Sequence, residues 1–175
     1  MFTTTYLISQ ILIIIAYALL GIGLQKKKRI QILTFSSIFQ ILMIIHYSLL
    51  WGISGIIASI IALLRNILFI YNDKKNKNNP ISILFLFAII AIISTFYFYK
   101  TLADFLPCIL TLIGIYSYWS KSTKITRIGN LLISVCYILY AVSLKSWLSI
   151  LCELYLIVNT IIGYLKYERY QNIEQ

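Results

Sequence analysis

Long runs of apolar residues, separated by short polar stretches, divide the chain into seven segments. The runs are too long and too uniformly apolar for the strands of a membrane barrel, in which apolar and polar positions alternate. A backbone surrounded by lipid must satisfy its own hydrogen bonds, which an α-helix does. The pattern therefore predicts an all-α membrane protein with seven transmembrane helices, over residues 6–24, 30–50, 53–71, 81–99, 102–119, 128–143 and 146–164.

The lengths of the runs and connections predict how these helices are joined. About 20 apolar residues cross a bilayer, so most runs fit and the sixth is short. The connections are short, so neighbouring helices are expected to be antiparallel; only residues 72–80 resemble a flexible linker. The first run has no Lys or Arg before it and no cleavage pattern behind it, which favours a permanent span over a signal peptide.

The composition excludes a soluble globular protein. Hydrophobic residues make up 61% of the 175 residues and charged residues only 11%, whereas soluble domains carry about 25% charged residues. Lipid must cover the surface that polar side chains cannot. We therefore expect one membrane domain, residues 1–175, with little chain left for a catalytic domain.

The net charge of +10 has a one-sided distribution. Twelve of the fifteen Lys and Arg residues fall in alternate connections and the C-terminal tail, whereas only Lys100 and Lys145 fall on the other side. The positive-inside rule then predicts an outside N-terminus and a cytoplasmic C-terminus. The cations are expected to contact anionic lipid at the cytoplasmic face rather than nucleic acid. Arg65 is the one cation expected inside a span.

A weak internal repeat divides the seven spans. Shifting the sequence by 93 positions superposes Gly21 on Gly114 and Asn66 on Asn159, among other matches. Two parallel three-helix repeats, residues 6–71 and 102–166, would then be joined by a linker helix at 81–99, a 3+1+3 arrangement.

Two charged residues within the spans are candidates for a functional site. Arg65 lies slightly to the cytoplasmic side of the centre of span three, and Glu153 slightly to the outer side of the centre of span seven. Ionisable groups at this depth are costly and tend to face a bundle interior. We expect the two to interact, either at a solute site or gate, or as a structural ion pair between the halves.

Polar residues at similar depth extend this candidate site. Asn66 and Asn159 occupy equivalent repeat positions, and Gln40 lies at the centre of span two. Amides donate and accept hydrogen bonds, so they can line a cavity and contact a polar solute. The alternative is that they bond to neighbouring backbone.

Three further residues are candidates for access or hinge roles. His46, in the outer half of span two, has a side chain suited to proton relay, although a His bonded to a carbonyl is the more common arrangement. Pro107 is either a gating kink or an early-turn proline in span five. Gly52 permits the tight outer turn before span three.

No constellation of residues points to an enzyme. The three cysteines lie in apolar runs without CxxC spacing, and the single His has no metal-ligand partner pattern. We therefore expect no catalytic residues, no metal and no cofactor.

Two stretches carry a family resemblance. HYSLLWGISGIIASIIALLRN at 46–66 resembles the YgjV-like family of bacterial inner-membrane proteins, with its His-aromatic pair, Leu-Leu-x-Gly turn and downstream Arg. YAVSLKSWLSILCELYLIVNTIIGYLKYER at 140–169 resembles the second signature of that family, with a Glu in the last span. The matching positions are His46, Gly52, Arg65 and Glu153. The resemblance implies a location in the bacterial inner membrane.

The same family is similar to the SWEET, PQ-loop and nicotinamide-riboside transporters, which are built from three-helix repeats. This similarity implies alternating access of a small solute, although the chain has no Pro-Gln dipeptide onto which PQ-loop prolines map. We therefore predict a small-solute transporter or facilitator. The alternative is a non-transporting membrane protein, such as an assembly factor, a receptor or an immunity-type partner. Substrate and oligomeric state stay open.

Overall fold

The computed structural model of the chain is a bundle of α-helices. It describes residues 4–51, 53–98, 105–143 and 147–169. A short π-helical segment, η2 (Leu165–Arg169), follows the last α-helix. The seven helices of the described residues are α1 (Thr4–Leu24), α2 (Arg29–Leu49), α3 (Ile53–Lys74), α4 (Ile81–Phe98), α5 (Phe105–Trp119), α6 (Thr123–Ser143) and α7 (Trp147–Tyr164).

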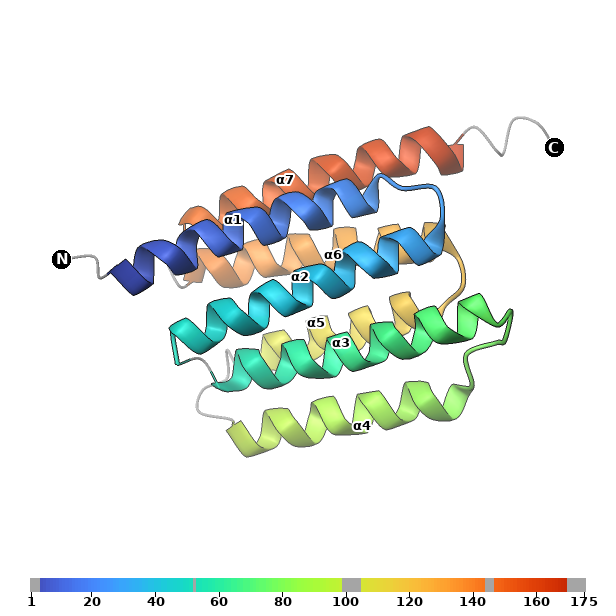
Figure 1. Cartoon of the computed structure of the whole chain (residues 1–175), viewed down its shortest axis with the longest axis horizontal. Coiled ribbons are helices and arrows are strands. Elements are labelled where there is room, and N and C mark those ends of the chain that lie inside the picture. The colour runs from blue at the N-terminus through green and yellow to red at the C-terminus, as the bar shows by residue number, and fades with distance from the viewer. Residues whose placement is uncertain (1–3, 52, 99–104, 144–146, 170–175) are drawn as a thin grey trace.

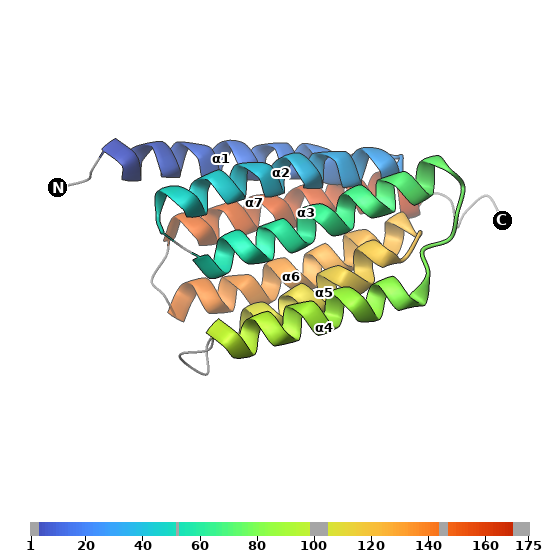
Figure 2. The same ribbon diagram turned by 60° about the horizontal axis from the view of Figure 1, so that its bottom comes forward.

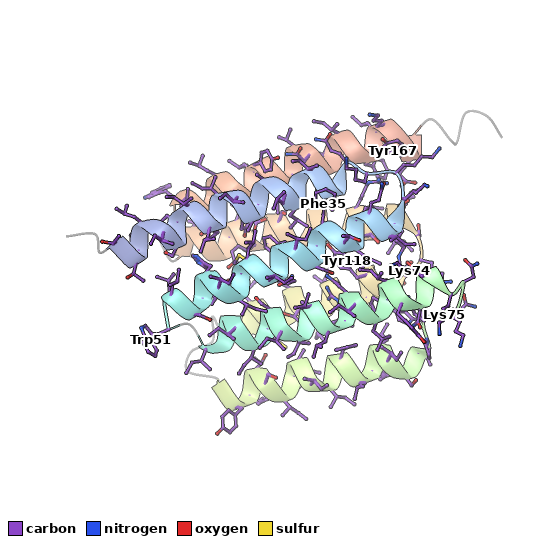
Figure 3. The ribbon with its side chains drawn as sticks, viewed as in Figure 1. Phe35, Trp51, Lys74, Lys75, Tyr118 and Tyr167 are labelled. Carbon is purple, nitrogen blue, oxygen red and sulfur yellow. The ribbon has the colours of Figure 1, made fainter. Side chains whose placement is uncertain are left out.

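All seven helices run along one axis, and the chain reverses direction at each connection (Figure 1). The connections after α1, α3 and α5 and the end of α7 therefore lie together at one end of the bundle. Lys74, Lys75 and Tyr167 mark this end, which we call the basic end, and Trp51 marks the opposite end, the Trp51 end (Figure 3). Lys100 and Lys145, the two cations expected at the Trp51 end, lie outside the described residues.

Six of the helices form a closed ring. Around the ring, α1 contacts α2, α2 contacts α3, α3 contacts α5, α5 contacts α6, α6 contacts α7 and α7 contacts α1. The remaining helix, α4, lies outside the ring against α3 and α5 (Figure 2). Phe87 and Ala91 of α4 pack there with Ile61 and Ile115 in a small buried cluster. The ring encloses the space in which polar side chains gather.

The outer surface is suited to lipid. Among the described residues, four helices are long and apolar enough to cross a membrane: Thr4–Leu24, Arg29–Leu49, Gly55–Lys74 and Trp147–Glu168. Ile81–Tyr97 and Cys108–Trp119 are shorter apolar helices. Many large apolar side chains, such as Leu139 and Ile93, point outward, whereas Ser, Asn, Arg and Glu side chains are buried inside. This inverted distribution confirms multiple membrane-spanning helices.

The start of the sixth helix differs from the expectation. The apolar run predicted a span over 128–143, but α6 begins at Thr123 and brings Lys124 and Arg127 into helical positions. The Ser122 hydroxyl accepts a hydrogen bond from the backbone N–H of Ile125 at 3.4 Å, as a helix-capping serine does. The run of apolar residues marks where lipid begins, and the helix continues past that point because its capping residue lies further back.

The α3–α4 connection is more ordered than its linker-like composition predicted. The helix α3 continues to Lys74, and the side chain of Asn72 donates to Asn79 at 3.1 Å. Asn79 in turn donates to the carbonyl oxygen of Trp119 at 2.8 Å, and the Trp119 indole donates back to the Asn79 carbonyl at 3.1 Å. These bonds attach the connection to the end of α5.

Candidate functional site

A cavity of about 490 Å³ lies inside the ring of six helices. Drug-sized ligands occupy pockets of roughly 300–1,000 Å³, so this space holds a small molecule. Every helix of the ring contributes to its wall, and five tyrosine or phenylalanine rings face it. The polar and charged residues of the wall are Ser36, Gln40, Ser59, Arg65, Thr111, Asn130, Ser134 and Glu153, and the aromatic ones are Tyr17, Phe39, Tyr47, Tyr118 and Tyr137.

Arg65, in the middle of α3, is the positively charged residue of the cavity wall. Its side chain is 4% exposed. The Nε and Nη2 atoms donate to Asn66 Oδ1 at 3.3 and 3.1 Å, and the guanidinium lies over the Tyr118 ring, 4.7 Å from its centroid. Asn66 and Tyr118 are both neutral, so their contacts hold the guanidinium in place without neutralising it.

Glu153, on α7, is the negatively charged residue of the wall and is 3% exposed. The Tyr17 hydroxyl donates to its Oε1 at 2.7 Å, and the Ser134 hydroxyl is a second polar neighbour of the carboxyl group. Oε2 is buried and has no hydrogen-bond partner among the described residues. A buried carboxylate oxygen without a donor is costly, so this atom is the strongest pointer to a ligand in the cavity.

The expected ion pair between Arg65 and Glu153 is not formed. The ion pairs within 4 Å in the described part of the chain are Arg29–Asp73 and Arg127–Glu168. Arg65 and Glu153 share the cavity wall, as their depths predicted, but each is bonded to neutral neighbours. Asn66 and Tyr118 are the neutral neighbours of Arg65, and Tyr17 is that of Glu153. Sequence spacing alone does not show which aromatic residues of other helices lie beside a charged residue.

The three amides of the candidate site have different environments. Gln40 lines the cavity. Asn66 lies behind Arg65, where its Nδ2 donates to the Ser36 hydroxyl at 2.9 Å. Asn159 accepts a hydrogen bond from Gln25 and donates to the Tyr155 carbonyl at 2.7 Å, so it joins α7 to the end of α1. Asn66 and Asn159 are thus positioning residues behind the wall, and neither is among the residues that line the cavity.

Two of the remaining candidates, His46 and Pro107, lie toward the Trp51 end. His46 is buried, with Nδ1 2.9 Å from the carbonyl oxygen of Ser9, so a contact with backbone holds its ring behind the wall. Pro107 lies in α5, two residues after the described part of the chain resumes at Phe105, so its role as a kink or an early-turn proline stays a prediction. Gly52 lies outside the described residues.

Arg127 forms a buried network at the basic end that the sequence did not predict. Its side chain is fully buried, and it pairs with Glu168 of η2. Nε donates to the carbonyl of Leu24 at 3.1 Å and Nη2 to that of Lys26 at 2.6 Å. Because the last carbonyls of a helix lack partners within it, Arg127 of α6 completes the end of α1. We call these contacts the Arg127 bridge.

Arg29 forms a corresponding network across the ring. From the first turn of α2, it pairs with Asp73 of α3 and donates through Nη2 to the carbonyl of Tyr118, near the end of α5. These contacts are the Arg29 bridge. The Arg29 bridge thus joins α2 and α3 to the end of α5. The Arg127 bridge joins α6 and η2 to the end of α1. Arg127 is therefore a second buried cation in addition to Arg65, at the basic end rather than in the middle of a helix.

The chain belongs to a family of bacterial inner-membrane proteins. The family model Imp-YgjV, described as bacterial inner membrane protein, matches residues 7–171, almost the full length. The search of curated proteins and the search of solved structures found no match. With its membrane-spanning helices, this match confirms the predicted location in the bacterial inner membrane.

Proposed function

We propose that this inner-membrane protein of the YgjV family is a transporter or facilitator that moves a small polar solute through the central cavity. The observation that carries the proposal is the cavity of about 490 Å³, enclosed by six helices and lined by one buried cation and one buried anion. Charged residues inside a membrane bundle are rare and costly, and they mark ion and solute pathways. Arg65, Glu153 and Gln40 would contact the solute.

The proposed mechanism is alternating access between two three-helix halves, α1–α3 and α5–α7, with α4 as the linker. A shift of 93 residues carries the bounds of α2 to 122–142, within one residue of α6 at each end. The two largest helix contacts between the halves, α3 with α5 and α7 with α1, correspond under the same shift. We propose that this mechanism resembles that of the SWEET and PQ-loop transporters.

We propose that all seven helices span the membrane, with the N-terminus outside and the basic end in the cytoplasm. Lys26, Lys27 and Lys28 in one connection and Lys74, Lys75 and Lys77 in the next support it, because cytoplasmic connections carry the excess of Lys and Arg. These lysines would also contact anionic lipid at that face.

The two bridges are the proposed cytoplasmic gate. The wall of the cavity extends along α3 from Gly55 to Arg65, and along α5 it reaches Tyr118, whose carbonyl takes part in the Arg29 bridge. Beyond Arg65, the Arg127 and Arg29 bridges tie the halves together at the basic end. The structure would therefore correspond to a state closed toward the cytoplasm. Opening would require Arg127 to leave the Leu24 carbonyl and Arg29 to leave the Tyr118 carbonyl.

Cysteine accessibility in oriented membrane vesicles tests the proposal. In a chain with Cys108, Cys136 and Cys152 replaced by Ala, Ser59→Cys places a thiol in the cavity wall. We expect a charged, membrane-impermeant thiol reagent to label it from the Trp51 side, and from the basic side when Arg127 is also changed to Gln.

The neighbouring variant Ile60→Cys is the matched control, since Ile60 is exposed on the outer surface of α3. Lipid should protect its thiol from the charged reagent on both sides. If Ser59→Cys is labelled from neither side under any condition, the cavity has no aqueous access and the protein is of the non-transporting kind.

A further inference from the structure

We infer that the cavity binds a small zwitterionic solute, with the anionic group of the solute at Arg65 and its cationic group at Glu153. This inference deepens the proposed function and rests on the cavity being the transport site. It names a substrate class, which is a molecule carrying one carboxylate or phosphate and one ammonium group, small enough for about 490 Å³.

The first step is the charge balance of the buried residues. Arg127, which is buried, and Arg29, which is half-buried, each have a carboxylate partner in the protein. Arg65, by contrast, is held by Asn66 and the Tyr118 ring, neither of which carries a charge. Among the described residues, Arg65 is the only cation of the wall and no carboxylate lies within 4 Å of it, so it is available to pair with an anionic group of a solute.

The second step is the unpartnered oxygen of Glu153. Tyr17 already donates to Oε1, whereas Oε2 has no partner among the described residues. An N–H donor that is also cationic satisfies this atom best, since a hydrogen bond between charged groups contributes about twice as much as one between neutral groups. An ammonium group on the solute fits this requirement.

The third step is the direction in which the solute would lie. The helices α3 and α7 both run from the Trp51 end toward the basic end (Figure 1). Arg65 is the thirteenth residue of α3, whereas Glu153 is the seventh of α7, so the carboxylate lies nearer the Trp51 end. The solute would enter with its anionic group leading toward Arg65 and its ammonium group following to Glu153.

The same arrangement disfavours other solutes. A neutral solute would displace water from Arg65 and Glu153 without offering either an opposite charge. A singly charged solute would leave one of the two unpaired. Hydrogen bonds to a charged group contribute about 1.5–3 kcal/mol, or about tenfold or more in affinity. We therefore expect a zwitterion to bind at least about tenfold more tightly than its singly charged analogues.

A matched ligand panel on the purified full-length protein tests this inference. The panel consists of glutamine, γ-aminobutyrate and phosphoethanolamine, each with an anionic group and an –NH3+ group, with butyrate, butylamine and butyramide as the anionic, cationic and neutral analogues. Binding is measured by the ligand-dependent rise in the unfolding temperature. We expect at least one zwitterion to bind, and all three analogues to bind at least about tenfold more weakly. The response to phosphoethanolamine relative to the two amino acids distinguishes a phosphate from a carboxylate group.

Variants of the two charges separate a site from a fold effect. In Arg65→Gln the preference for the zwitterion over butylamine should disappear, and in Glu153→Gln the preference over butyrate should disappear. Arg65→Lys, which keeps the charge, should retain most of the preference. Leu139→Ala, on the exposed face of α6, is the control that should behave like the parent protein. A change of selectivity in these directions is not produced by misfolding.

The outcomes also distinguish this inference from the proposed function. Equal binding of the neutral or singly charged analogues, or binding of none of the zwitterions, overturns the inference. If vesicles accumulate an uncharged solute, the transporter remains and the substrate class is wrong. If a zwitterion binds while Ser59→Cys stays inaccessible from both sides, the site is supported and transport is not.

Discussion

The basic end and the cavity use buried charge in opposite ways. At the basic end, Arg127 and Arg29 are each paired with a carboxylate and with helix-terminal carbonyls. In the cavity, Arg65 and Glu153 share one wall and are bonded to neutral groups instead. Both regions lie inside the same ring of helices. The difference teaches that pairing within the protein serves assembly, whereas a missing partner leaves a charge available to a solute.

The largest effect expected is from Arg127→Gln. Removing one member of a buried pair leaves Glu168 uncompensated and frees the Leu24 carbonyl, which costs about 3–5 kcal/mol of folding stability. A fall of the unfolding temperature in detergent measures this loss. The double variant Arg127→Gln, Glu168→Gln should recover part of it, because no unpaired charge remains. A single variant as stable as the parent protein would contradict the assembly role of the Arg127 bridge.

An intermediate effect is expected from Gly163→Ala, at the contact of α7 with α1. A Cβ atom at Gly163 would lie 2.4 Å from the backbone oxygen of Leu24, so the two helices would have to separate. Overpacking of this kind costs about 1–3 kcal/mol.

The matched control for this substitution is Gly114→Ala, in the cavity wall. A Cβ atom there would make only ordinary contacts, at 3.5 Å from Arg65 Nη1 and from Ile133. Thermal unfolding should show a loss for position 163 and almost none for position 114. Equal losses would mean that the cavity region is packed as tightly as the contact between the halves.

The smallest effect on stability is expected from Glu153→Gln. A charge inside a membrane bundle costs about 2.5–3.5 kcal/mol on insertion scales, and the substitution removes it while an amide oxygen remains to accept from Tyr17. Unfolding measurements should therefore show that the free energy of unfolding falls by less than about 1 kcal/mol or rises. The same variant should lose its selectivity for the solute. A loss as large as that of Arg127→Gln would place Glu153 with the structural charges and remove the contrast between the two regions.

The helices themselves were largely predictable. Where the structure also describes the residues before the helix, α2 and α4 start within one residue of the predicted segments, because the requirement to satisfy the backbone in lipid leaves little choice for a long apolar run. The exception, α6, begins five residues early, since its first turns lie beyond the apolar run and depend on Ser122 as a cap. Hydropathy reports the extent of lipid contact and is insensitive to such polar helical turns.

The bridges were not predicted, although a signal for them is present. The positive-inside rule counts Lys and Arg alike and uses them only to indicate the membrane side. Arg29 and Arg127, however, are arginines in stretches where the other cations are lysines. The planar guanidinium binds carboxylates and carbonyls with several donors at once, which lysine does not. Asp73 and Glu168 are also two of only five acidic residues and lie at the same end. A scarce acidic residue together with an arginine, both near helix ends on the same side, is therefore the sequence pattern that indicates such a bridge.

Tyr118 belongs to both regions, since its ring lies under Arg65, its hydroxyl donates to Asn130 at 3.2 Å and its carbonyl accepts from Arg29. A solute that draws Arg65 off this ring would change the surroundings of the residue that anchors the Arg29 bridge. Coupling free energy is reciprocal: if binding of the solute changes the equilibrium constant for forming the Arg29 bridge by some factor, formation of the bridge changes the affinity for the solute by the same factor. Affinity measured in Arg29→Gln would then report the energetic link between occupancy and gate, without any need to observe the gate moving.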